Sequence, residues 1–116
     1  MNMEKNEIIK KELSKYKKIY KDVDKDRKPF TEKLYNQAAF MVATLEELQY
    51  TINEEGPVIT SVNGNGFETT MEHPAQKSYN TMIKNYNATI KALIDLLPNA
   101  NGGGDEFTEF LSRDKK

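Results

Sequence analysis

The fold depends on one stretch of sequence, residues 54–74, which reads EEGPVITSVNGNGFETTMEHP. Gly56 and Pro57 end a helix, because glycine accepts the left-handed conformation after the last helical residue and proline cannot continue the helix. Pro74 starts another helix, since proline at the first helical position lacks only a donor that would be unpaired. His73, directly before it, is expected to cap that helix or to lie in a turn.

Between these two signals the sequence changes from helical to β-prone. Asn63-Gly64-Asn65-Gly66 is typical of a tight turn, and it separates two short candidate strands, Val58–Val62 and Phe67–Met71. We therefore expect a small β-hairpin over residues 58–71. A two-stranded ribbon is marginal in water, so it should lean on the helices or pair with a neighbouring copy.

Long apolar seams precede and follow this hairpin. Six apolar residues before it are separated by 4, 3, 4, 3 and 4 positions, and six after it repeat the same spacing, as in two helices that pack along one face. The first seam consists of Leu34, Ala38, Met41, Leu45, Leu48 and Ile52, and the second of Tyr79, Ile83, Tyr86, Ile90, Leu93 and Leu97. These seams predict an antiparallel helical pair, and we expect this pair to form an oligomerisation core over residues 29–98.

The start of the first long helix is expected at Thr31, which is a good N-cap. Phe30 and Tyr35 are placed to form a hydrophobic staple around that cap. Before it, residues 1–28 predict a short N-terminal helix with an apolar stripe, followed by a charged linker from Lys21 to Lys28 that Pro29 ends. The fold class is therefore mainly α, with a disordered C-terminal tail at 99–116.

Composition excludes several classes of protein. The longest apolar run is Ala38–Ala43, far shorter than the ~20 residues of a spanning helix. No cysteine and a single histidine exclude disulfides and argue against a metal site or a catalytic pair. We expect a cytosolic protein that is not an enzyme, with no cofactor and no membrane partner.

Charge is unevenly distributed along the chain. Residues 1–28 hold ten basic residues against six acidic ones, whereas residues 29–72 hold one against seven. The lysines of the first helix could contact phosphate oxygens of DNA, because lysine acts as a point charge and does not read bases. A solvated helix surface is the plainer alternative. The candidate DNA-binding residues are Lys10, Lys11, Lys17, Lys18 and Lys21.

Two further features could bind partners. Tyr35, Phe40 and Tyr50 lie outside the main seam of their helix, which indicates a second contact surface and self-association in addition to an ordinary core. The candidate oligomerisation or core residues are Leu34, Met41, Leu45, Leu48, Ile52, Tyr79, Ile83, Tyr86, Ile90 and Leu93. In the tail, the acidic segment with Phe107, Phe110 and Leu111 could fold in a partner's groove, or it could be a frayed terminus.

The order of these elements resembles the small terminase subunits of tailed bacteriophages, in the group found with HNH-endonuclease packaging modules. The resemblance extends from Glu7 to Pro98. Its most specific parts are Glu54-Glu55-Gly56 at the end of one helix and His73-Pro74-Ala75 at the start of the next.

The resemblance implies a non-catalytic packaging factor in the cytoplasm of an infected or lysogenic bacterial host. Such subunits form homo-oligomeric rings through helical hairpins, recognise viral double-stranded DNA, and recruit and regulate the large terminase subunit, which holds the ATPase and the nuclease. By the same resemblance, the tail from Asp105 to Leu111 would contact the large subunit. The alternative is a helical protein-interaction adaptor with no nucleic-acid role.

Overall fold

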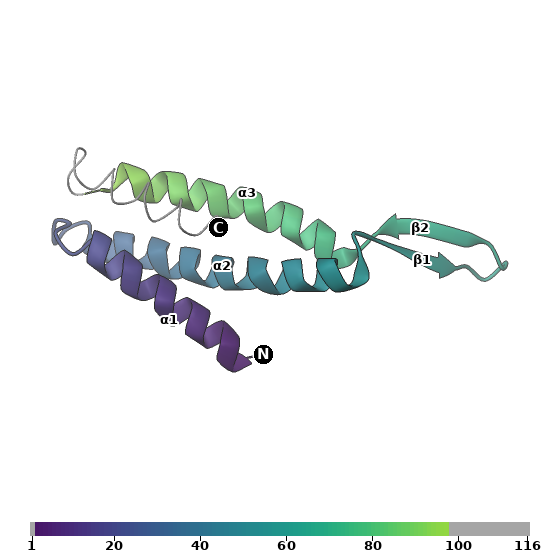
Figure 1. Ribbon diagram of the computed structural model, residues 1–116. Coiled ribbons are helices and arrows are strands. Elements are labelled where there is room, and N and C mark those ends of the chain that lie inside the picture. Colours follow the sequence, from purple (N-terminus) through teal and green to yellow (C-terminus); the bar gives the residue numbers. More distant parts are fainter. Residues whose placement is uncertain (1, 98–116) are drawn as a thin grey trace.

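The computed structural model describes residues 2–97, with side chains from residue 4 onward. Three helices make up most of this part of the chain: α1 (Asn2–Ile19), α2 (Lys28–Glu55) and α3 (Pro74–Asp95). Figure 1 shows α2 and α3 side by side and antiparallel, with α1 folded back onto α2. The mainly α fold with an antiparallel helical pair is confirmed.

Two short strands connect α2 to α3. β1 (Val58–Val62) and β2 (Glu68–Glu72) pair antiparallel, with Thr60 opposite Thr70. The Asn63 carboxamide oxygen closes the turn by accepting the backbone N–H groups of Asn65 (2.9 Å) and Phe67 (3.1 Å). The predicted hairpin is confirmed, and its second strand begins and ends one residue later than the sequence suggested.

The hairpin extends beyond the ends of the helices (Figure 1). Every residue of the two strands is exposed except Ile59, which is half-buried. The hairpin therefore does not lean on the helices of its own chain, which was one of the two arrangements expected for it. Val62 and Phe67, with 66% and 68% of their surface exposed, are among the most accessible apolar residues described.

The start of α2 differs from the prediction. The helix begins at Lys28, not Thr31, and Pro29 lies in its first turn, so this proline initiates the helix instead of ending a linker. Thr31 is fully buried, and its hydroxyl donates to the Arg27 carbonyl at 2.9 Å. Phe30 is 70% exposed, so the predicted hydrophobic staple does not form.

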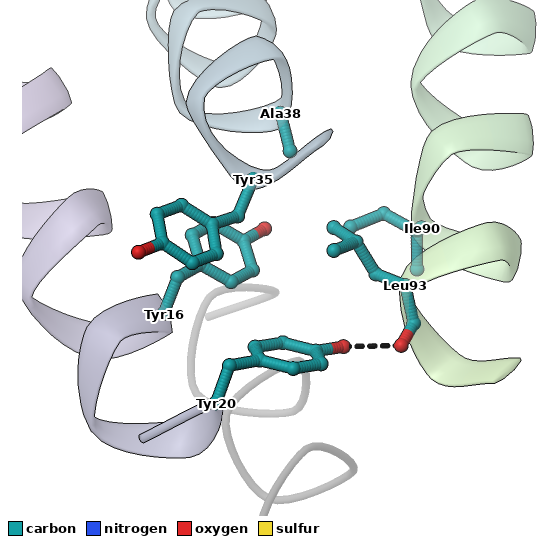
Figure 2. Close-up of a cluster of buried hydrophobic side chains, with 6 residues drawn as sticks. All are labelled: Tyr16, Tyr20, Tyr35, Ala38, Ile90 and Leu93. Carbon is teal, nitrogen blue, oxygen red and sulfur yellow. Dashed lines mark hydrogen bonds between the residues drawn. The ribbon is translucent and has the colours of Figure 1, made fainter. Parts of the chain in front are cut away.

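Three tyrosines form the centre of the core, where α1, α2 and α3 meet (Figure 2). Tyr16 and Tyr35 are stacked with ring centroids 5.7 Å apart, and Tyr20 lies 6.2 Å from Tyr35. The Tyr20 hydroxyl donates to the backbone carbonyl of Leu93, which satisfies a polar atom inside the core. The expectation that Tyr35 belongs to a spare contact surface is wrong, because α1 folds over it.

Burial changes the acid–base behaviour of these phenols. It raises the pKa of Tyr16 and of Tyr20 well above the usual 10.0, because the charged phenolate would lose its hydration. Burial also raises the pKa of Tyr35, and the nearby Glu32 carboxylate adds to this effect. The cluster therefore favours neutral tyrosines.

The junction between helices and hairpin is held by His73. Its Nδ1 accepts the backbone N–H of Ala75 at 2.9 Å, its Nε2 lies 2.8 Å from Glu55 Oε1, and its backbone N–H donates to the Pro57 carbonyl at 2.8 Å. The predicted capping role is confirmed. Gly56 has a φ of 84° as expected, but its ψ of 164° lies outside the left-handed helical region, in a conformation that essentially only glycine adopts.

Candidate nucleic-acid interface

The predicted lysines share one part of the α1 surface. Lys10, Lys11, Lys17 and Lys18 lie on α1, Lys21 follows it in the turn, and all five are exposed. They face away from the core because Tyr16 and Tyr20 turn the opposite side of this chain segment toward α2. From Lys10 to Lys18 the helix advances by about 12 Å. We call these five residues the lysine face.

Other lysines of α1 are already engaged within the protein. Lys5 Nζ lies 2.7 Å from Glu47 Oε1 and 4.5 Å from the centre of the Phe40 ring. Lys15 Nζ lies 3.5 Å from Oε2 of the buried Glu12. Within residues 2–97, none of the five lysines of the lysine face forms an ion pair, so their charge remains available to an external anion.

A small hollow lies at one end of the lysine face. Its volume is about 250 Å³, and its charged lining consists of Lys17, Lys21 and Lys28 with one acidic residue, Glu32. Three lysines against one glutamate leave a net positive lining, which favours an anion such as a phosphate group. Lys28 was not among the predicted lysines, because only the fold of the turn at 20–27 brings it beside α1.

The opposite end of the molecule is acidic. Glutamates gather at the C-terminal half of α2 and on β2: Glu46, Glu47, Glu54, Glu55, Glu68 and Glu72. Because like charges repel, a polyanion would be directed away from the hairpin and toward the lysine face. The charge asymmetry of the sequence thus becomes an asymmetry between the two ends of the molecule.

The predicted core and oligomerisation residues lie mainly in one interface. The seams of α2 and α3 pack on each other, with Leu45, Ile90 and Leu93 buried and the other seven residues partly buried. Apolar side chains left exposed on the helices are Phe30, Phe40, Tyr50 and Ile94. Phe40 and Tyr50 therefore fulfil the prediction of apolar surface outside the seam, which Tyr35 does not.

A shallow groove separates α1 from the α2–α3 pair. Its volume is about 510 Å³, and its apolar lining comes from all three helices, including Ile8, Val42, Ile83 and Tyr86. The buried Glu12 lies at its edge. The sequence gives no signal that Glu12 is buried, because it is one of three glutamates on a lysine-rich helix and the other two are exposed.

Two other kinds of feature are not found in the described residues, and the predicted tail site lies outside them. Within residues 4–97, no three His, Cys, Asp or Glu side chains are grouped to hold a metal ion. No helix in the described part of the chain has the length and hydropathy needed to cross a bilayer. The tail residues Phe107, Phe110 and Leu111 lie outside the described residues.

Comparison with known proteins identifies no family for this chain. It matches no protein-family model, no curated protein and no solved structure at a significant level.

Proposed function

We propose that the protein is a small terminase subunit of a tailed bacteriophage. In this role it is a non-catalytic, self-associating protein that binds viral double-stranded DNA and recruits and regulates the large terminase subunit during genome packaging. The observation that carries the DNA-binding part is the lysine face, five exposed lysines that form no ion pair among the residues that the structure describes.

The chemistry of the lysine face favours backbone contact. Lysine ammonium groups bind phosphate oxygens without the forked geometry that reads base edges, so binding would be weakly sequence-selective. The hollow beside Lys28 adds one position where a phosphate would meet several lysines. The acidic hairpin end would remain away from the DNA.

The other parts of the proposal rest on the resemblance and on apolar surface. Phe30, Phe40 and Tyr50 are exposed large side chains on α2, which supports self-association. A ring and contact with the large subunit through residues 105–111 are carried over from the resemblance.

Salt-dependent DNA binding tests the lysine face. The double variant Lys10→Gln/Lys17→Gln should bind duplex DNA more weakly for all sequences, and the slope of log K against log salt should shrink by about 2, one unit for each lost phosphate contact. Replacing all five lysines should remove a slope of about 4 to 5. Fluorescence anisotropy titrations at salt concentrations from about 50 to about 200 mM measure both effects.

A matched control is available on α3. Lys77→Gln/Lys84→Gln removes the same charge from two exposed lysines that are also seven positions apart, but outside the lysine face. The control should keep most of the slope. If both double variants lose it equally, net charge and not the lysine face drives binding.

A protein-interaction adaptor is the second candidate function. The groove of about 510 Å³ favours it, because a groove between helices with both apolar and charged lining suits an amphipathic partner helix. An adaptor predicts no DNA binding at 50 mM salt and no effect of the lysine substitutions. DNA binding that depends on the lysine face would reject this alternative.

A further inference from the structure

The outer edge of β1 offers backbone N–H and C=O groups to a partner, whereas the surfaces described above offer side chains. Asn63 donates to the Phe67 carbonyl and His73 donates to the Pro57 carbonyl. Hydrogen-bonded pairs alternate along an antiparallel ladder, so Ser61/Thr69 and Ile59/Met71 are also bonded pairs. The backbone N–H and C=O groups of the three remaining β1 residues therefore point outward: Val58, Thr60 and Val62.

The two edges of the hairpin are not equivalent. β2 carries Glu68 and Glu72 at two of its three outward positions, and charged residues are a common protection against edge-to-edge pairing. β1 reads Val-Ile-Thr-Ser-Val and carries no charge. Its β-branched residues suit a strand with neighbours on both sides.

The β1 sequence is also complementary to itself. When two copies pair antiparallel about Thr60, Val58 of one copy meets Val62 of the other, and Thr60 meets its own equivalent. All outward groups of both strands are then paired, in about six hydrogen bonds. The glutamates stay on the outer strands, so no like charges face each other across the contact.

We propose that β1 is a self-association edge, and that its partner is β1 of a second copy of this chain in a two-fold, four-stranded sheet. The contact extends the exposed two-stranded hairpin to four strands, and a two-stranded hairpin alone is only marginally stable in water. Because the contact is two-fold, it pairs two copies and does not close a ring, so it is an additional contact to the ring proposed above, and it does not depend on DNA binding. Failure of the test below would leave the lysine-face experiment unaffected.

Disulfide trapping in the full chain tests the register. The chain contains no cysteine, so Thr60→Cys introduces the only thiol. Bonded pairs have Cα atoms about 5.5 Å apart, which suits a disulfide. Mild oxidation should give a covalent dimer at least about tenfold faster than for Thr70→Cys, which is also exposed and lies directly opposite on β2. Equal rates, or a faster Thr70→Cys reaction, would overturn the proposal.

A pair of proline variants tests the hydrogen bonds. Thr60→Pro removes an outward N–H that the hairpin itself does not use, and Thr70→Pro does the same on the β2 edge. Because a strand edge is smaller than a standard interface, native mass should be measured at high protein concentration. Thr60→Pro should halve the mass of the assembly, whereas Thr70→Pro should retain it. The same mass for both variants would contradict the β1 contact.

Discussion

At the end of the molecule where α1 turns into α2, Tyr16, Tyr20 and Tyr35 are packed against Leu93 with almost no exposed surface. At the other end, Val62 and Phe67 of the hairpin remain largely exposed. Both ends are rich in large apolar or aromatic residues, yet only one buries them. The difference arises because three helices converge at the first end, whereas nothing in the described chain covers the second (Figure 1).

This comparison separates stability from interaction. Burial of apolar area dominates the free energy of folding, so the tyrosine end should determine the stability of the fold. The hairpin contributes little to that free energy and keeps its strand edges free. Substitutions at the two ends should therefore differ sharply in their effect on unfolding.

The largest difference is expected between Leu93→Ala and Val62→Ala. Leu93 is fully buried, so its truncation leaves a cavity and should lower the free energy of unfolding by about 3 kcal/mol. Val62→Ala should change it by less than about 0.5 kcal/mol. Urea unfolding followed by circular dichroism, at a concentration too low for self-association, measures both. Equal losses would show that the hairpin belongs to the cooperative core.

A smaller effect is expected at the junction between the two ends. Gly56→Ala should destabilise the fold by about 2 kcal/mol, because φ is 84° there. The nearest atom to an added Cβ is the Val58 oxygen at 3.9 Å, so backbone conformation alone causes the loss. Gly64→Ala, in the hairpin turn, meets no atom within 4 Å and should be nearly neutral. A neutral Gly56→Ala would mean that the junction relaxes freely.

Tyr20→Phe should have the smallest effect at neutral pH. It removes one of two donors to the Leu93 carbonyl, which still accepts the Leu96 backbone N–H at 3.1 Å, and should cost about 1 kcal/mol. Tyr50→Phe, which removes an exposed hydroxyl, should cost less than about 0.5 kcal/mol. Thermal or urea unfolding of the two variants at pH 7 gives the comparison.

The same variant predicts a change in pH dependence. Burial raises the pKa of Tyr20 in the folded state, so above pH 10 the unfolded chain loses a proton that the folded protein keeps. The stabilisation is complete below pH 10 and is lost as the pH rises toward the folded-state pKa. Tyr20→Phe should therefore lose stability less steeply than the unsubstituted protein between about pH 10 and about pH 11.5. The two slopes should differ by an amount on the order of one bound proton. Parallel curves would indicate that the Tyr20 hydroxyl is accessible to water.

The sequence predicted much of the fold because its strongest signals are local and periodic. The seams that contain Leu45 and Leu93, and the turn residues around Asn63, each act over a few positions. The predicted start of α2 at Thr31 is wrong, because Thr31 and Pro29 are both compatible with a helix start and local sequence does not choose between them. What decides between them is burial of Thr31, which is a tertiary contact.

The candidate site was predicted in part. The exposure of Lys10 and Lys17 follows from the apolar stripe of α1, which points the opposite face to solvent. The hollow that adds Lys28 could not be predicted, since it forms between two helices that the turn brings together. The burial of Glu12 has the same cause, because it depends on how closely α1 approaches α2.

The sequence by itself determined the helices, the hairpin between them and the lysine-rich character of α1, because periodicity, proline, glycine and charge act through neighbouring positions. Only the tertiary structure decided that Tyr35 is core, that Lys28 joins the lysine face at its hollow, and that the hairpin stands clear of the helices with its β1 edge unpaired. These outcomes depend on the direction in which packed helices leave their turns, and that direction is set by contacts between residues far apart in the chain.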